Sequence, residues 1–303
     1  MQRMEVNELV ERYQSGERIF NQINLYEADL SGLELPEISL QRCDLRDANL
    51  EGTNFRLANL REAKLSNVNL NGADLRGANC REARLDGSSL QKANCAEANL
   101  IGADLSRADL TQQAKLDGAS LRGSKLSETN LEGASLVEAN LSEADLNQAV
   151  LVRAMLREAT LHQAKLTGVD FTSANLTKAN LTKVNLNDAV LVRANLTDAF
   201  LSGASLLGAN LDSCDLRRAK LVGTDLTGAN LNKANLRETN LSWSTLRQTN
   251  LSNCNLFQAQ LQWSNASGAN LSGAVLINAE LLRTNLRQVN LRGALMPDGK
   301  KFE

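Results

Sequence analysis

An apolar residue, almost always leucine, occupies every fifth position along nearly the whole chain. One run of these centres extends from Leu25 to Leu110, and a second extends from Leu116 to Met296, with one extra residue between the two runs. The residue two positions before each centre is small and most often alanine. The residue just before the centre is usually Asn or Asp, and the two residues after it are polar or Gly.

A period of five residues matches neither an α-helix, with about 3.6 residues per turn, nor a β-strand, with a period of two. The chain can keep its leucines on one side only if it turns after every unit. Four turns close a coil of 20 residues, with Leu in the middle of each side and the small residue beside the corner. Stacked coils pair as parallel β-structure at a spacing of about 4.8 Å. The sequence therefore predicts an all-β solenoid of about 13–14 square coils.

The unit Ala-(Asp/Asn)-Leu-x-x resembles the motif of the pentapeptide repeat family over residues 24–296, and the chain is most similar to the cyanobacterial members. The segment from Met296 to Lys300 is similar to the way many of those chains end. This resemblance implies a right-handed quadrilateral parallel β-helix.

The two ends of the chain depart from the repeat. Residues 1–23 are expected to form a helical cap, because Val6, Leu9, Val10 and Tyr13 share one helical face and solenoid ends need covering. A helix that binds a partner is the alternative. Residues 297–303 are expected to form a C-terminal cap or tail that begins with a turn.

One extra residue near 111–113 interrupts the repeat between its two runs. Because loops accept insertions at little cost, we expect a tolerated bulge at one corner. A recognition loop is the alternative interpretation.

Composition excludes several classes of protein. The chain has 33 Lys and Arg against 35 Asp and Glu, so no basic stripe for direct nucleic-acid binding is expected. No apolar run reaches the roughly 18 residues that a membrane span needs. Five cysteines, an odd number, fit a reducing compartment, and we expect a cytoplasmic protein.

The sequence contains no recognisable catalytic or metal-binding arrangement, so we expect no enzyme, cofactor or metal. The only histidine, His162, follows a centre and is expected on the surface. All five cysteines occupy inward positions of the repeat and are expected to act as small apolar residues. These five are Cys43, Cys80, Cys95, Cys214 and Cys254.

A candidate contact surface lies near the C-terminus. Trp243, Trp263 and Arg283 are 20 residues apart, each two after a centre, so they are predicted to stack as one column with Leu282 beside them. Phe257 and Ile277 are predicted to point outward on the adjoining side. Clustered exposed apolar residues often mark a contact with a partner or with a second copy. A local stack that only stabilises the end of the solenoid is the alternative.

The resulting functional prediction is a rigid interaction or scaffolding module whose partner is another protein. The alternative is a DNA-mimicking binder of DNA gyrase, because the resemblance includes the quinolone-resistance pentapeptide proteins. Such mimicry needs one continuous acidic face, and each outward side of the repeat mixes charges of both signs.

Overall fold

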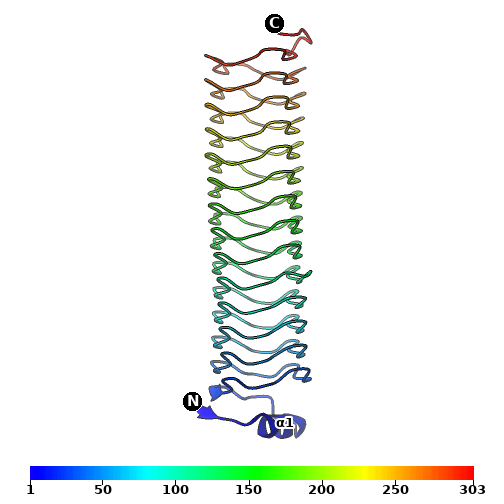
Figure 1. The fold of residues 1–303 in the computed structure, drawn as a ribbon, viewed down its shortest axis with the longest axis vertical. Helices are drawn as coiled ribbons and strands as arrows, with labels where there is room; N and C mark the ends of the chain where they lie inside the picture. The colour runs from blue at the N-terminus through cyan, green and yellow to red at the C-terminus, as the bar shows by residue number, and fades with distance from the viewer. The chain divides into compact units, whose positions relative to one another are not determined.

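The computed structural model describes residues 1–303, which form two compact units, Met1–Val150 and Leu151–Glu303. Each unit is a stack of coils (Figure 1). Within both units, one residue in every five pairs in parallel with the residue 20 positions further along, apart from one shift near residue 112. The pairs extend from Ile19–Ser39 to Asn130–Val150 in the first unit, and from Met155–Asn175 to Val275–Leu295 in the second.

Regular secondary structure is sparse despite this pairing. It consists of β1 (Gln2–Arg3), α1 (Val6–Gln14) and β2 (Ile23–Asn24), and β1 pairs in parallel with β2. Elsewhere the parallel pairs are isolated bridges of one residue each. The reason is the short period, because a turn after every unit leaves too few extended residues for a longer strand.

Each unit of the repeat ends in a tight turn. In one example, the N–H of Ala48 donates to the carbonyl oxygen of Leu45 at 3.1 Å, and Asp47 between them has a φ of 59°. A positive φ at this position is typical of a type II turn and favours Gly. Many turns carry a larger residue there at a cost of about 1 kcal/mol each. The turn directs that side chain outward, so surface function in this fold concentrates at turn positions.

The core consists of the central leucines and the small residues beside them. Leu60 and Leu181 have no exposed surface, and Ala174 is also buried. In the last coil Leu281 and Leu286 are only half-buried, because no further coil covers them. Burial in one coil therefore depends on the coils on both sides, as stacked repeats require.

Asparagines before the centres form a ladder of side-chain hydrogen bonds along one side of the second unit. The Oδ1 atom of Asn230 accepts the backbone N–H of Asn232 at 3.2 Å and the side-chain amide of Asn250 at 2.9 Å. Asn270 and Asn290 continue the ladder, since the side-chain amide of each donates a hydrogen bond to Oδ1 of the preceding asparagine, at 3.4 and 3.1 Å. One side chain thus holds its own turn and joins two coils.

The extra residue shifts the register of one coil. Gln112 and Gln113 both have positive φ, and Asn94 pairs with Lys115, 21 residues away. The spacing returns to 20 where Lys115 pairs with Ser135. The bulge is therefore absorbed within one coil.

Both chain ends fold against their neighbouring coils. Leu9 of α1 is fully buried, and the hydroxyl of Tyr13 donates to the carbonyl oxygen of Pro36 at 2.8 Å. At the other end, Lys301 pairs antiparallel with Leu295 after a turn at Gly299. No helix has the length and apolar character that crossing a lipid bilayer requires.

Candidate functional site

Trp243, Trp263 and Arg283 form one column on three successive coils of the second unit. The two indole rings stack with centroids 5.0 Å apart and planes within 2° of parallel. The Cζ atom of Arg283 lies 4.2 Å from the centroid of the Trp263 ring. The structure thus places these three residues as the sequence predicts. Their role as a partner contact stays a prediction.

The column is exposed although its members stack on one another. Trp243 is 62% exposed, Trp263 is 41% exposed and the neighbouring Leu282 is 66% exposed. The preceding residue in the column is Gly223, and no heavy atom lies within 4 Å of the position that its Cβ would take. One ring face of Trp243 therefore has no side chain of its own column against it.

Phe257 and Ile277 lie on the adjoining side, and both are half-buried. The guanidinium of Arg237 covers Phe257, with Cζ 4.9 Å from the ring centroid. The apolar surface on this side is consequently smaller than the sequence alone indicates. Sequence reasoning missed Arg237, although its place one coil before Phe257 was a usable signal.

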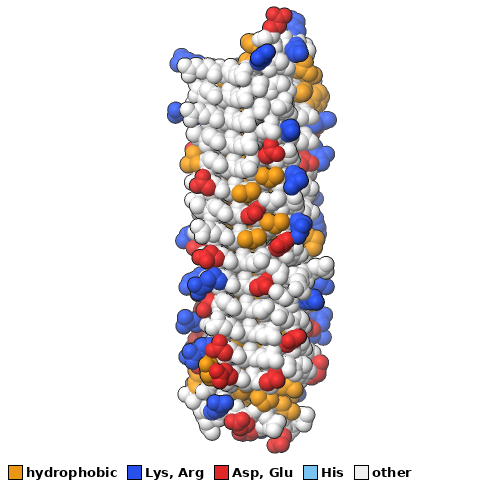
Figure 2. Space-filling view, in the orientation of Figure 1, with side chains coloured by type: hydrophobic (Ala, Val, Ile, Leu, Met, Phe, Trp, Pro, Cys, Tyr) orange, Lys and Arg blue, Asp and Glu red, His pale blue; other side chains and the backbone are white.

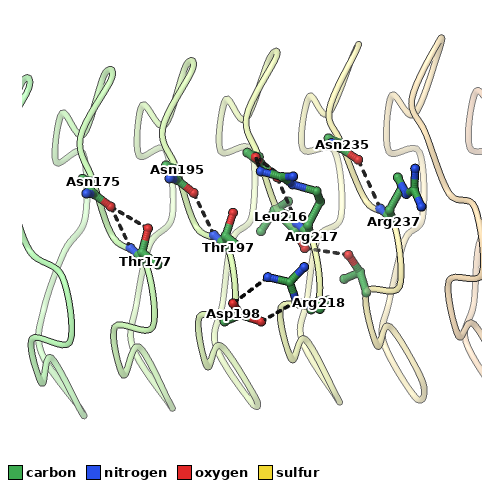
Figure 3. Close-up of polar contacts among 12 residues, drawn as sticks. Asn175, Thr177, Asn195, Thr197, Asp198, Leu216, Arg217, Arg218, Asn235 and Arg237 are labelled. Carbon is green, nitrogen blue, oxygen red and sulfur yellow. Dashed lines mark hydrogen bonds and ion pairs between the residues drawn. The ribbon is translucent and has the colours of Figure 1, made fainter.

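Arg237 forms a cluster with two further arginines, Arg217 and Arg218 (Figure 3). Arg217 forms a bidentate pair with Asp215, at 2.6 Å from Nη2 to Oδ2, and Arg218 forms one with Asp198, at 2.8 Å for both contacts. The hydrogen bond from Arg218 lowers the pKa of the Asp198 carboxyl below its ordinary value.

A surface cavity of about 370 Å³ lies at this arginine cluster. Its lining residues are Arg217, Arg218, Asn235, Arg237, Glu238 and Asn255. The lining is almost entirely polar and is rich in hydrogen-bond donors. Sequence reasoning missed this site, because 20-residue spacing alone does not show which way a side chain turns.

Charged side chains of both signs are scattered over the visible face of the molecule, with hydrophobic side chains between them (Figure 2). Several charges pair between coils, as in the contact of Arg42 with Glu62 at 2.7 Å. Such pairs neutralise charge locally, so no large field of one sign develops on this face.

The residues considered for catalysis or metal binding are placed as follows. All five cysteines are free thiols and buried, and burial raises the pKa of Cys43 to about 11 and that of Cys254 to about 12. His162 Nδ1 lies 2.7 Å from the hydroxyl of Thr182, one coil away. No group of three or more His, Cys, Asp or Glu side chains is placed to hold a metal ion.

Comparison with known proteins places these features in a family. The family model described as "Pentapeptide repeats" matches successive segments from residue 38 to residue 293. No protein with a curated description matches the chain.

Among solved structures, the chain is similar to HetL, a pentapeptide repeat protein involved in heterocyst differentiation regulation from the cyanobacterium Nostoc sp. strain PCC 7120. The identity is 31% over 99% of this chain and 100% of HetL, with a TM-score of 0.22. Rfr23 from the cyanobacterium Cyanothece 51142 is 36% identical over 32% of this chain and 58% of its own, with a TM-score of 0.21. QnrB1, a plasmid-mediated fluoroquinolone resistance protein, is 20% identical over 63% of this chain and 89% of its own, with a TM-score of 0.41.

Proposed function

Because the chain belongs to the pentapeptide repeat family, which implies a right-handed β-helix, we propose that it is a non-enzymatic module that binds another protein. The observation that carries this proposal is the exposed tryptophan stack in a chain with only two tryptophans. Trp and Arg are the residue types that most often dominate the binding energy of protein interfaces.

We also propose that the solenoid has a quadrilateral cross-section and an N-terminal helical cap, and that this fold gives the contact a rigid support. Four rows of parallel bridges in each 20-residue coil support a quadrilateral cross-section. The buried Leu9 and the bond from Tyr13 to Pro36 support a capping role for α1. A stiff backbone lowers the entropy that ordering a binding surface would cost.

The proposed contact is the C-terminal patch, which we define as Trp243, Trp263, Leu282 and Arg283 with Phe257 and Ile277 beside them. The ring face of Trp243 that has no side chain of its own column against it can accept a flat or apolar group of a partner. Arg283 holds Trp263 from the other side, so the stack keeps its geometry before the partner arrives. A stack that only stabilises the last coils remains the competing explanation, and the variants below separate the two.

Paired capture from a lysate of the source organism tests the proposal. The baits are the intact protein and the double variant Trp243→Ala, Trp263→Ala, with bound proteins identified by mass spectrometry. Phe200→Ala is the matched control, because Phe200 is another exposed ring stacked with a cation, Lys220, at 5.0 Å. We expect a partner that the intact protein and the control retain and the folded double variant loses. Equal recovery on all three baits would reject the patch as a contact.

Self-association is one form of the same proposal, in which the partner is a second copy. Sedimentation velocity over a range of protein concentrations would detect it. Under this form the intact protein forms a dimer and the tryptophan double variant is monomeric at the same concentration.

We also propose a cytoplasmic location, which the five free thiols support, because reducing compartments keep cysteines unpaired. Cell fractionation with an antibody to the protein would test this location.

A further inference from the structure

The cavity at the arginine cluster has a donor arrangement that the proposed interaction patch does not use. Arg217 and Arg237 occupy the same turn position on successive coils, and Arg218 follows Arg217 directly. Asn235 and Asn255, which precede the centres on this side, complete the donor set of the lining with their side-chain amides. Donors from three successive coils thus meet at one cavity.

Two of the three guanidinium groups are fixed before any ligand binds. Arg217 uses Nε and Nη2 on Asp215, and Arg218 uses Nε and Nη2 on Asp198. In both residues Nη1 keeps its two hydrogens outside these pairs. A planar group fixed in this way loses little rotamer freedom when it forms a further hydrogen bond.

The third guanidinium has no hydrogen-bonded carboxylate. The nearest carboxylate oxygen to Arg237 is Oε1 of Glu238, 3.8 Å from Nη2, which is beyond hydrogen-bond distance. The group lies over the ring of Phe257 at 4.9 Å, which positions it without using its donors. Arg237 therefore brings the largest unused set of N–H donors to the cavity.

The asparagines on the side of the cavity form no amide ladder between coils. Asn235 and Asn255 each accept a backbone N–H through Oδ1, from Arg237 at 3.4 Å and from Phe257 at 3.1 Å. Their amide nitrogens make no bond to the preceding coil, unlike those of Asn230 and Asn250. Two oriented amides are thus left with donors to offer.

We infer that this cavity binds an oxyanion, which is either a carboxylate or a phosphate group. The donors are the guanidinium of Arg237, the Nη1 atoms of Arg217 and Arg218, and the side-chain amides of Asn235 and Asn255. Hydrogen bonds from charged donors to an oxyanion are stronger than neutral ones. Glu238 is the one acidic side chain in the lining and opposes the anion. The charges of Asp198, Asp215 and Glu238 balance those of the three arginines, so recognition depends on short-range hydrogen bonds. This inference goes beyond the proposed protein contact and does not depend on it.

Titration of the full chain with inorganic phosphate and, separately, with glutarate tests the inference, with sodium chloride keeping the ionic strength constant. The readout is the NMR signals of arginine Nε–H and asparagine side-chain NH2 groups. We expect saturable shifts of the signals from Arg237, Asn235 and Asn255 with at least one anion. Tighter binding of phosphate assigns the site to phosphate groups, and tighter binding of glutarate assigns it to carboxylates.

Three variants separate a specific site from general charge attraction. Arg237→Met should weaken binding by about tenfold or more, the order expected for loss of a charged hydrogen-bond partner. Arg247→Met is the matched control, because Arg247 has the same place in the repeat on another side and the change in net charge is identical. Glu238→Gln should strengthen binding several-fold.

The absence of saturable shifts with either anion would overturn the inference, and so would equal weakening by Arg237→Met and Arg247→Met. The double variant Trp243→Ala, Trp263→Ala should bind the anion as the intact protein does. Failure of the anion site and failure of the tryptophan contact can therefore be told apart.

Discussion

At the residue scale, position within the five-residue unit decides the role of each side chain. A central residue such as Leu181 is fully buried, whereas Lys183, two positions later, is exposed at a turn with a φ of 57°. A charged side chain is therefore accommodated at position 183 but would be buried at position 181. This strict division explains why surface residues vary widely while the centres stay apolar.

Replacement of Leu181 by Asp should abolish cooperative folding of the second unit. The change places a carboxylate among buried leucines without a partner, at a cost above about 4 kcal/mol. Thermal unfolding followed by circular dichroism would measure the loss. Lys183→Asp is the control and should melt close to the parent protein. A Leu181→Asp variant that melts like the parent would contradict the coil arrangement.

The cysteine thiols should be unreactive in the folded protein. Burial raises the pKa of Cys43 from its ordinary value of 9.0 to about 11, so its thiol stays protonated in the folded state at pH 8. A chromogenic disulfide reagent at pH 8 should modify no thiol in the native protein and all five in denaturant. Because the unfolded thiol ionises first, this group lowers stability as pH rises from 9.0 through about 11. Rapid modification of native protein at pH 8 would contradict this placement.

At the scale of the single coil, the unit of five can absorb one extra residue. Gln112 and Gln113 both adopt positive φ, and the amide of Gln112 donates to the side-chain oxygen of Gln91 at 3.0 Å. The parallel bridges across the bulge, from Asn94–Lys115 to Asp109–Asn130, join residues that are 21 rather than 20 positions apart. The bulge is therefore a local change in one turn, because the neighbouring centres remain buried.

Deletion of Gln113 should restore the regular spacing and leave the melting temperature within a few degrees of the parent value, as small loop changes usually do. Deletion of Gln163 is the matched control, because Gln163 has the same residue type and a similar φ of 58° in a regular turn. That deletion leaves one unit short and should destabilise the second unit strongly. Differential scanning calorimetry would compare the two. Loss of cooperative unfolding on deletion of Gln113 would show that the extra residue has a structural role.

At the scale of the whole molecule, charge separates the proposed interaction module from a mimic of duplex DNA. The chain carries a formal net charge of −2 at pH 7, with 33 basic and 35 acidic residues. Duplex DNA carries one negative charge per about 1.7 Å of its axis. The visible face in Figure 2 mixes both signs, so it lacks the dense negative row that such mimicry needs.

We therefore expect the purified protein to leave DNA gyrase activity unchanged. A supercoiling assay with gyrase and relaxed plasmid, over a range of protein concentrations up to a large excess, would measure the effect. A fluoroquinolone-resistance pentapeptide protein such as QnrB1 would be the reference. Inhibition at stoichiometric amounts would favour the gyrase-binding alternative over the proposed contact.

The sequence by itself determined which residues share a column and which face the core. This was possible because a period of five with a 20-residue coil leaves no freedom of register once the leucines are buried. The stacking of Trp243 on Trp263 and the Asn230–Asn250 ladder were predictable for that reason. The limited extent of regular strand structure was not predictable from the sequence.

Only the tertiary structure decided the direction of the long surface side chains. Arg217 and Arg218 turn toward Asp215 and Asp198. Arg237 instead lies over Phe257, an aromatic ring that the sequence placed in solvent. A long side chain at a turn has several partners within reach on its own and adjacent coils. The competition among those partners depends on distances that spacing along the chain does not contain. The donor-rich cavity is a consequence of that competition.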